Sequence, residues 1–443
     1  MSHDLPTSSN LSSEPTVNGV DRRRFVQTAA ALSALPLVAP VWGSVRADDQ
    51  IKVGLLGCGG RGTGAAANAL NADPGVVIWA MGDLFPDRIE RAITQLEENS
   101  DPDRVLVEDE RKFTGFDAID KLLASDIDVV ILATPPGFRP VQLEKAVAAN
   151  KHIFTEKPMA TDVPGARQAM AAAKAAKEKG LSLVSGFCWR YSSPERAVYG
   201  RILDGDIGRV QAAHSTYHSG PLGVQPRQPD WSDMEFELKN WWHFCWLAGD
   251  IIVEQACHSV DKLNWVKNNE PPVKCVALGG RGNRSGPERG NVFDHFTAIY
   301  EYADGTRSIL TCRQQANCAN DNTDWVAGEK GLAFINGWAP RTTRIEPSNG
   351  SAKWSYTGPT PNMYDVEHAE LFKSIRDGKP LNDGDFMVQS TLMSIMGRDA
   401  AYTGQQLTWD ELLKSDQVLV PTTLEWGPLP EPVIPVPGRT RFA

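Results

Sequence analysis

A glycine-rich turn at residue 57 constrains the fold of this chain more than any other feature. The apolar run 51–56 leads into Gly57-Cys58-Gly59-Gly60-Arg61-Gly62, and an alanine-rich stretch with helical character follows. This is the pattern G-x-G-x-x-G between a buried strand and a helix. Gly57 permits a tight turn, Gly59 lets the backbone approach a pyrophosphate, and Gly62 lets the helix pack on the strand. We therefore expect a dinucleotide to contact Gly57, Gly59, Gly60, Arg61 and Gly62.

An acidic residue stands at the spacing that this kind of site requires. A second apolar run, 76–80, ends near Asp83, which lies 21 residues after Gly62. A carboxylate there can accept hydrogen bonds from the adenosine-ribose hydroxyls, and it would repel a 2′-phosphate. Asp83 therefore favours NAD over NADP, although Arg88 lies within reach of a helical turn.

Two further buried strands are expected at 128–133 and 152–154. Thr134 and Pro135 follow the first of them, and Glu156 and Lys157 follow the second. In an open parallel sheet, ligands bind beyond the carboxyl ends of the strands. These four residues are therefore assigned, with Asp83 and the glycine turn, to one cofactor site.

The first 47 residues have the parts of an export signal. The stretch 1–20 is rich in Ser, Thr, Asn and Pro, and Arg22, Arg23 and Arg24 then precede an apolar segment that ends at Val45-Arg46-Ala47. A charged start, an apolar middle and a small-residue exit are typical of a secretory signal. The paired arginines resemble the twin-arginine type. We expect a periplasmic protein with a signal at 1–47; an uncleaved anchor and a chance basic helix are the alternatives.

Composition excludes several classes of partner and site. The 443 residues carry 45 Lys plus Arg and 55 Asp plus Glu, a net charge of −10, whereas nucleic-acid binding needs a basic face. Seven cysteines with no C-x-x-C pair make neither a disulfide framework nor a zinc ribbon. Beyond the N-terminal segment, no apolar run reaches the roughly 18 residues of a membrane span. We expect no nucleic-acid partner and no membrane span after processing.

Four segments together resemble one enzyme family, the Gfo/Idh/MocA oxidoreductases: the glycine turn, Ala133-Thr134-Pro135, the stretch 151–158 around Glu156-Lys157-Pro158, and the stretch 248–261. The resemblance covers nearly the whole mature chain. It implies a doubly wound parallel Rossmann domain at 48–180, then an α/β domain at 181–425 with a large open, mostly antiparallel sheet, and a Pro-rich tail at 426–443. It also implies a homo-oligomer, a dimer or tetramer, formed through the open sheet.

The resemblance also implies catalytic roles. Lys157 would contact the nicotinamide ribose and the substrate hydroxyl, and His258 would take the hydroxyl proton. A lysine partly desolvated beside a cofactor cation has its ammonium disfavoured, which suits proton transfer. Glu254 stands where relatives commonly have Asp, and i,i+4 spacing on a helix would place Glu254 and His258 on one face as a carboxylate–imidazole pair. A further departure is Arg139 and the three residues before it, where relatives often carry His.

Substrate contacts are expected from aromatic and charged residues of the second domain. Arg190 and Tyr191 lie where relatives line the nicotinamide end of the pocket, and Asp261 lies three residues after His258. Trp241 belongs to an aromatic cluster that could stack on the C–H faces of a sugar; a core or subunit contact is the alternative.

The sequence thus predicts an exported NAD(H)-dependent oxidoreductase acting on a secondary hydroxyl of a sugar, cyclitol or glycoside. Because no soluble nicotinamide pool is expected outside the cytoplasm, the cofactor should be tightly bound and recycled. Three alternatives stay open: an NAD-dependent redox-neutral glycosidase, a metal-assisted lyase in which Glu254 and His258 bind zinc, and a non-catalytic sugar-binding protein. The favoured interpretation, an NAD(H)-dependent oxidoreductase, needs no metal ion.

Overall fold

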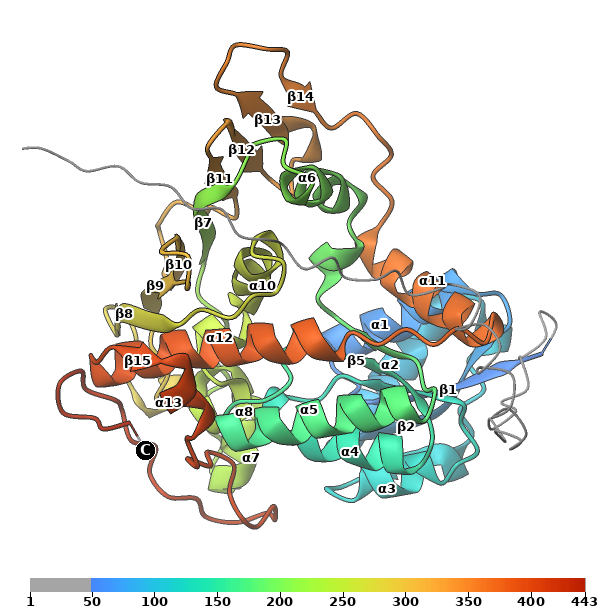
Figure 1. Cartoon of the computed structure of the whole chain (residues 1–443). Coiled ribbons are helices and arrows are strands. Elements are labelled where there is room, and N and C mark those ends of the chain that lie inside the picture. Colours follow the sequence, from blue (N-terminus) through green and yellow to red (C-terminus); the bar gives the residue numbers. More distant parts are fainter. Residues whose placement is uncertain (1–48, 443) are drawn as a thin grey trace, which may run out of the picture. The chain divides into compact units, whose positions relative to one another are not determined.

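A six-stranded parallel sheet opens the part of the chain that the computed structural model describes, residues 49–442 (Figure 1). The predicted signal at 1–47 lies outside these residues. The strand order is β3-β2-β1-β4-β5-β6, the doubly wound arrangement expected from the glycine turn. The strands are β1 (Ile51–Leu56), β2 (Val76–Asp83), β3 (Lys112–Thr114), β4 (Val129–Leu132), β5 (His152–Thr155) and β6 (Leu183–Ser185).

Helices cover both faces of this sheet, which is why its strands are apolar along nearly their whole length. Apolar side chains of α1 and α2 pack in one core cluster, and those of α3, α4 and α5 pack in another. The bounds are α1 (Gly60–Ala72), α2 (Pro86–Asn99), α3 (Ala118–Leu123), α4 (Arg139–Ala148) and α5 (Val163–Glu178).

The first domain extends beyond its expected end at residue 180. Strand β6 pairs in parallel with β5 and completes the first sheet, so residues 183–185 belong to it. The chain then crosses to the second domain through a short 3-10 turn, Cys188–Tyr191, and α6 (Ser193–Leu203).

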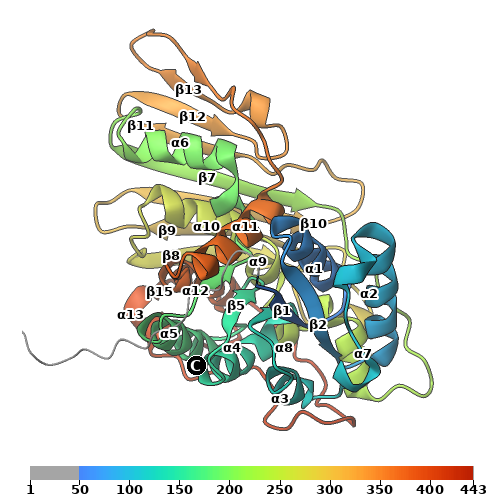
Figure 2. The same ribbon diagram turned by 90° about the vertical axis from the view of Figure 1, so that its right-hand side faces the viewer.

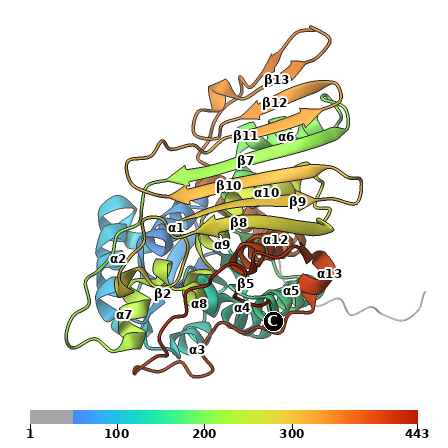
Figure 3. The same ribbon diagram turned by 90° about the vertical axis from the view of Figure 1, so that its left-hand side faces the viewer.

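The second sheet has nine strands in the order β14-β13-β12-β11-β7-β10-β9-β8-β15. All neighbours are antiparallel except β7 and β10, so the expectation of a mostly antiparallel sheet is confirmed. Figure 3 looks onto the face that lies away from helices α6 and α10. The strands are β7 (Val210–Ser219), β8 (Lys274–Gly280), β9 (His295–Glu301), β10 (Arg307–Gln314), β11 (Asp324–Gly328), β12 (Gly331–Ile335), β13 (Arg344–Pro347), β14 (Trp354–Ser355) and β15 (Leu407–Thr408).

The remaining helices join the two sheets (Figure 2). Helix α11 packs on α1, and α12 packs on both α5 and α10, so the C-terminal helices return to the first domain. The bounds are α7 (Asp233–Lys239), α8 (Cys245–Ala248), α9 (Ile251–Glu254), α10 (Cys257–Val266), α11 (Met363–Arg376), α12 (Gly384–Thr403) and α13 (Trp409–Leu413).

The segment after α13 lies along the surface of both domains without helix or strand in its described residues, 414–442. Leu419 N donates to Asp162 Oδ2 at 2.8 Å, and Leu429 N donates to Asp233 Oδ2 at 3.1 Å. These bonds hold the segment first to the N-terminus of α5 and then to that of α7. No helix within residues 49–442 is long and apolar enough to span a bilayer.

Candidate active site

One cavity of about 780 Å³ lies at the carboxyl ends of the first sheet's strands and extends to the second domain. All the residues assigned to the cofactor from sequence line it: Gly57, Gly59, Gly60, Arg61, Gly62, Asp83, Thr134, Pro135, Glu156 and Lys157. Glu254, His258 and Trp241 line the same cavity. The structure thus brings together residues that are up to about 200 positions apart in the chain.

The glycine turn has the geometry that a bound pyrophosphate requires. Gly57 has φ +95°, a conformation that side chains rarely adopt. A Cβ on Gly62 would lie 1.8 Å from the carbonyl oxygen of Gly57, so only glycine lets α1 start this close to β1. At Gly59 and Gly60, in contrast, a Cβ would meet no atom within 4 Å, because these residues face open space. The residues therefore fit a dinucleotide whose phosphates lie against the free N–H groups of α1.

The Asp83 carboxylate is held beside this turn by backbone hydrogen bonds. Its Oδ2 accepts from Cys58 N at 2.7 Å, and its Oδ1 accepts from Phe85 N at 3.0 Å. Burial raises the pKa of Asp83, and Arg88 acts in the opposite direction. Arg88 Nη1 lies 4.0 Å from Asp83 Oδ1, so a cation stands near the acid that would contact the ribose.

Arg61 is held by carboxylates of the protein itself. Its Nε donates to Glu156 Oε1 at 2.5 Å, and its Nη2 lies 3.2 Å from Oε1 of the buried Glu367 on α11. Gly186 leaves room for this pair, since a Cβ there would lie 2.6 Å from Glu156 Oε2. Both Arg61 and Glu156 line the cavity, but their charged groups neutralise each other beneath the glycine turn. Sequence reasoning missed Glu367, which comes from a helix 306 positions later.

In the four residues after Pro135, Gly137 packs against the second domain and Arg139 connects two loops of the first. Gly137 lies so close to α8 that a Cβ would be 2.4 Å from the carbonyl oxygen of Trp246. Arg139 is buried, and its guanidinium donates to Thr134 O at 2.5 Å and to Pro158 O at 2.6 Å. Burial lowers the pKa of Arg139 to about 10. It therefore ties the loop after β4 to the loop after β5.

Lys157 forms an ion pair with Glu254, which contradicts part of the sequence prediction. Its Nζ lies 2.8 Å from Glu254 Oε1 and 2.5 Å from the carbonyl oxygen of the same residue. Burial by itself lowers the pKa of Lys157, but the Glu254 carboxylate together with Cys257 and Glu156 outweighs it, and the net shift of the pKa is upward. The ammonium is thus favoured rather than disfavoured, because the lysine has an acidic partner within its buried site. Lys157–Pro158 is a cis peptide bond.

Glu254 and His258 do not lie on one continuous helix. Helix α9 ends at Glu254, two turn residues follow, and α10 begins at Cys257. The Glu254 carboxylate is bonded to Lys157 instead of the imidazole, so the expected carboxylate–imidazole pair is not formed. His258 Nδ1 is buried and has no hydrogen-bond partner within residues 49–442. Burial and then the charge of Lys157 lower the pKa of His258, which keeps the ring neutral.

Aromatic side chains from the second domain line part of the cavity. Trp241 and Trp242 stack with ring centroids 3.8 Å apart and both line it, together with Gln225 and Lys239. Tyr364 of α11 also lines it, and its ring centroid lies 4.8 Å from Arg61 Cζ. Trp241 and Trp242 belong to the aromatic cluster expected from the sequence, whereas Gln225, Lys239 and Tyr364 were not predicted, because neither their spacing nor their type sets them apart.

Arg190, Tyr191 and Asp261, which were assigned to the substrate, do not line the cavity. Arg190 makes a bidentate ion pair with Asp261, both nitrogen–oxygen distances being 2.8 Å. Tyr191 donates from its hydroxyl to Asp383 Oδ2 at 2.7 Å. All three side chains therefore hold the domain crossover to α10 and α12. The family resemblance suggested a place in the pocket for Arg190 and Tyr191, but their polar groups connect packed helices.

Within residues 49–442, no group of three or more His, Cys, Asp or Glu side chains is placed to hold a metal ion. All seven cysteines are free thiols, and Cys318 alone among them is exposed.

Comparison with known protein families decides the assignment. Residues 51–187 match the oxidoreductase family with an NAD-binding Rossmann fold, and residues 196–334 match the GFO/IDH/MocA C-terminal domain. Both matches belong to one family and follow each other along the chain. The chain belongs to the Gfo/Idh/MocA family of oxidoreductases.

The sequence identity between this chain and individual Gfo/Idh/MocA proteins is low. The chain is 25% identical over 301 residues to an inositol 2-dehydrogenase of Rhizobium meliloti, covering 68% of this chain and 80% of the relative. Two solved structures share the fold. An aldose-aldose oxidoreductase from Caulobacter crescentus, complexed with glycerol, has a TM-score of 0.64 at 20% identity and covers 81% of this chain and 99% of its own. A 3-ketoreductase from Actinomadura kijaniata, complexed with NADP, has a TM-score of 0.61 at 19% identity and covers 79% and 97%.

Proposed function

We propose that this protein transfers hydride between NAD and a secondary hydroxyl of a sugar, cyclitol or glycoside. The observation that carries the proposal is that Lys157, Glu254 and His258 line the same cavity as the glycine turn. Bound NAD⁺ would accept the hydride from the substrate carbon. The protein's part is to hold the hydroxyl, move its proton and exclude water.

The side chains support distinct roles in proton transfer. The Lys157 ammonium, fixed by Glu254, would donate a hydrogen bond to the substrate oxygen and stabilise the negative charge that develops there. His258 is neutral, and because its Nδ1 is buried, Nε2 is the nitrogen that can accept the hydroxyl proton. The stacked Trp241 and Trp242 offer an aromatic surface for the C–H face of a sugar ring.

We propose NAD rather than NADP as the cofactor. Asp83 keeps lone pairs available for ribose hydroxyls, and its buried charge would repel a 2′-phosphate. Arg88 reduces this repulsion without removing it, since its Nη1 lies 4.0 Å from Asp83 Oδ1, beyond hydrogen-bond distance. Titration of the purified protein with each nucleotide, followed by tryptophan fluorescence, tests the choice; equal affinity for NADP would contradict it.

The activity is tested by mass spectrometry of the bound cofactor and a screen of sugars and cyclitols for changes in NADH absorbance. We expect reduction of NAD with at least one polyhydroxylated substrate, and its loss in Lys157→Met with cofactor binding kept. A protein that neither contains nor binds a nicotinamide cofactor would refute the proposal.

The cover over the cavity supports a tightly held cofactor. Helix α7 contributes Leu238 and Lys239 to the cavity wall. The C-terminal segment lies against the same region, because the Trp426 ring lies 5.8 Å from that of Phe85 and 5.1 Å from that of Phe116. Both phenylalanines line the cavity at the ends of β2 and β3. We infer that these contacts slow the release of a nucleotide bound there.

Tight binding would permit chemistry without net oxidation. A cofactor that stays bound returns to NAD⁺ either when a second sugar is reduced or when a transient ketone is reduced after glycosidic bond cleavage. Incubation with paired sugars and with glycosides, followed by product analysis, separates these cycles from simple oxidation.

Export remains a proposal based on the twin-arginine pattern at 1–47. Replacing Arg22 and Arg23 with Lys should leave the protein in the cytoplasm of a host with the twin-arginine pathway. The wild-type chain should appear in the periplasm beginning near residue 48. Equal distribution of both forms would contradict the proposal.

A homo-oligomer is proposed from the open face of the second sheet (Figure 3). The strand register places Val276, Ile299, Ile309, His214 and Trp325 in one row across five strands. Val276, Ile299 and Trp325 are 45%, 37% and 39% exposed, and Leu278 on the same face is 71% exposed. An apolar face of this extent is typical of an interface.

A further inference from the structure

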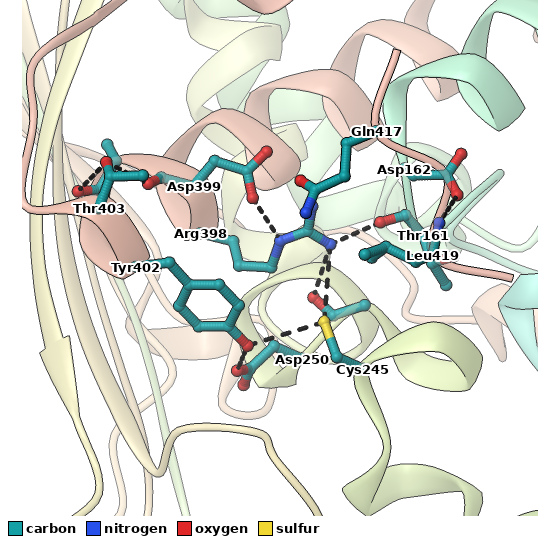
Figure 4. Close-up of polar contacts among 12 residues, drawn as sticks. Thr161, Asp162, Cys245, Asp250, Arg398, Asp399, Tyr402, Thr403, Gln417 and Leu419 are labelled. Carbon is teal, nitrogen blue, oxygen red and sulfur yellow. Dashed lines mark hydrogen bonds and ion pairs between the residues drawn. The ribbon is translucent and has the colours of Figure 1, made fainter. Parts of the chain in front are cut away.

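A buried arginine of α12 contacts two loops of the candidate active site. Arg398 Nη1 donates to the carbonyl oxygen of Thr161 at 2.5 Å and lies 3.4 Å from that of Gly249. Its Nε donates to Asp399 Oδ1 at 2.7 Å, which balances the charge. In Figure 4, Arg398 points toward Thr161 on one side and toward the segment from Cys245 to Asp250 on the other.

These two carbonyl groups belong to the segments that carry the catalytic candidates. Thr161 follows Lys157 by four residues, and Gly249 precedes Glu254 by five. Helix α12 holds the first segment at a second point, because Thr391 Oγ1 accepts from Met159 N at 3.0 Å. One helix therefore fixes the backbone on both sides of the Lys157–Glu254 ion pair.

Asp250 fixes the start of the second segment. It has φ +83°, which is uncommon for a residue with a side chain. Its Oδ1 caps α9 by accepting from Ile251 N at 2.5 Å, and its Oδ2 accepts from Phe293 N at 2.7 Å and from the Tyr402 hydroxyl. Tyr402 lies one helical turn after Arg398, so α12 holds the Gly249–Asp250 turn from two positions (Figure 4).

We propose that Arg398 and Asp250 are positioning residues that set the distance between Lys157 and Glu254. The proposal rests on the proposed function, since the distance between Lys157 and Glu254 affects the rate only if this pair takes part in the proposed reaction. Both acceptors of Lys157 come from Glu254, so a shift of one segment weakens both bonds together. In a buried site, a misplacement of about 1 Å can lower a rate by about 100-fold.

Four substitutions separate positioning from general stability. Arg398→Lys keeps the charge but loses the planar fork that serves two carbonyl groups and Asp399. Tyr402→Phe removes one bond to Asp250. Asp250→Gly relieves the positive φ yet removes the bonds to Phe293 and Tyr402. Arg376→Met is the control, because it removes a partly buried ion pair elsewhere, between Arg376 of α11 and Asp73 of the first domain.

We expect loss of positioning to lower kcat but to leave KM and cofactor binding nearly unchanged. Arg398→Lys and Asp250→Gly should lower kcat by about 10- to 100-fold, with KM and bound NAD within about threefold of wild type. Tyr402→Phe should give a smaller decrease. Arg376→Met should lower the thermal midpoint while kcat is unchanged. If Asp250→Gly and Arg398→Lys both keep wild-type kcat in folded protein, the proposal is wrong.

A second measurement does not depend on activity. Competitive acetylation with acetic anhydride, quantified at Lys157 by peptide mass spectrometry, reports how strongly its ammonium is held. We expect low reactivity in wild type, a several-fold increase in Glu254→Gln, and an intermediate increase in Arg398→Lys and Asp250→Gly. A protein without dehydrogenase activity that shows this series would refute the proposed function and keep the positioning role. Unchanged reactivity in both variants would refute the positioning role whatever the activity.

Discussion

At the scale of single residues, the glycine turn and the Lys157–Glu254 pair represent two kinds of constraint. The turn is constrained by space: a side chain fits at Gly59 but collides with backbone at Gly62. The pair is constrained by charge, because a buried lysine without a carboxylate would lose its proton readily. Each constraint predicts a different result when it is removed.

Gly59→Ala and Gly62→Ala should therefore differ. Gly59→Ala should fold with an unchanged thermal midpoint but bind NAD at least about tenfold more weakly, because the methyl group enters the cavity. Gly62→Ala should lose about 3 kcal/mol or more of stability, since its Cβ would lie 1.8 Å from Gly57 O. Thermal unfolding and nucleotide titration measure the two effects. Equal destabilisation of both variants would contradict this account.

Glu254→Gln should lower kcat by about 100-fold while the protein still binds NAD, because Lys157 loses the carboxylate that holds its ammonium. Glu254→Asp keeps the charge and restores the residue that relatives commonly have, so it should keep more activity than Gln. Steady-state kinetics over a pH series checks both variants. Glutamine with activity equal to aspartate would show that the carboxylate charge is unnecessary.

At the scale of elements, helix α12 and the irregular segment after α13 both contact the surroundings of the candidate site, although both lie far from the glycine turn in the sequence. Helix α12 contacts both segments that carry the candidate catalytic residues, through Thr391, Arg398 and Tyr402. The segment after α13 lies against α7, where Met234 N donates to Gly427 O at 3.1 Å. It thus fastens α7 near the phenylalanines at the ends of β2 and β3.

Trp426→Ala should increase the dissociation rate of NAD by about tenfold, because two ring contacts worth about 0.5–1.5 kcal/mol each are lost. Trp338→Ala is the matched control, since Trp338 is 63% exposed and packs on Trp189 away from the cavity. Stopped-flow displacement of bound NADH measures the rate. If both variants release NADH like wild type, the segment does not retain the cofactor.

At the scale of the whole molecule, buried ionisable groups connect pH with stability. His152 accepts from Ser182 N at 3.0 Å through Nδ1, which requires that nitrogen to be unprotonated. Burial lowers the pKa of His152 from 6.5 to about 4. Between these values the unfolded chain binds the proton more readily, so the stabilisation is complete above pH 6.5 and is lost as pH falls toward 4.

His152→Asn keeps an acceptor for Ser182 but removes this titration. The stability of wild type relative to the variant should therefore fall by at most about 3 kcal/mol between pH 6.5 and 4, with a slope of up to about 1.4 kcal/mol per pH unit. Urea unfolding at several pH values measures it. A difference that does not change with pH would contradict the assignment.

The sheet face gives a prediction about assembly. Ile299→Glu places a charge in the middle of the apolar row and should shift the protein to a smaller species in light scattering coupled to size exclusion. Val141→Glu is the control, because it makes the same charge change at a valine of α4 in the first domain that is 48% exposed. A wild-type protein that is monomeric at micromolar concentration would refute the proposed oligomer.

Lys157 and His258 were suggested by the family resemblance, whereas the sequence by itself determined the parallel sheet, the glycine turn and the acid at the end of β2. These depend on local patterns, because a strand, a turn and a helix follow from residues that are neighbours in the chain. Only the tertiary structure decided the partners: Glu367 for Arg61, Glu254 for Lys157, and Asp261 for Arg190. Each pairing joins residues from distant segments, so its geometry follows from how helices and loops pack. That packing placed three expected substrate contacts, Arg190, Tyr191 and Asp261, between helices instead of in the cavity, and it placed Arg398 behind the Lys157–Glu254 pair.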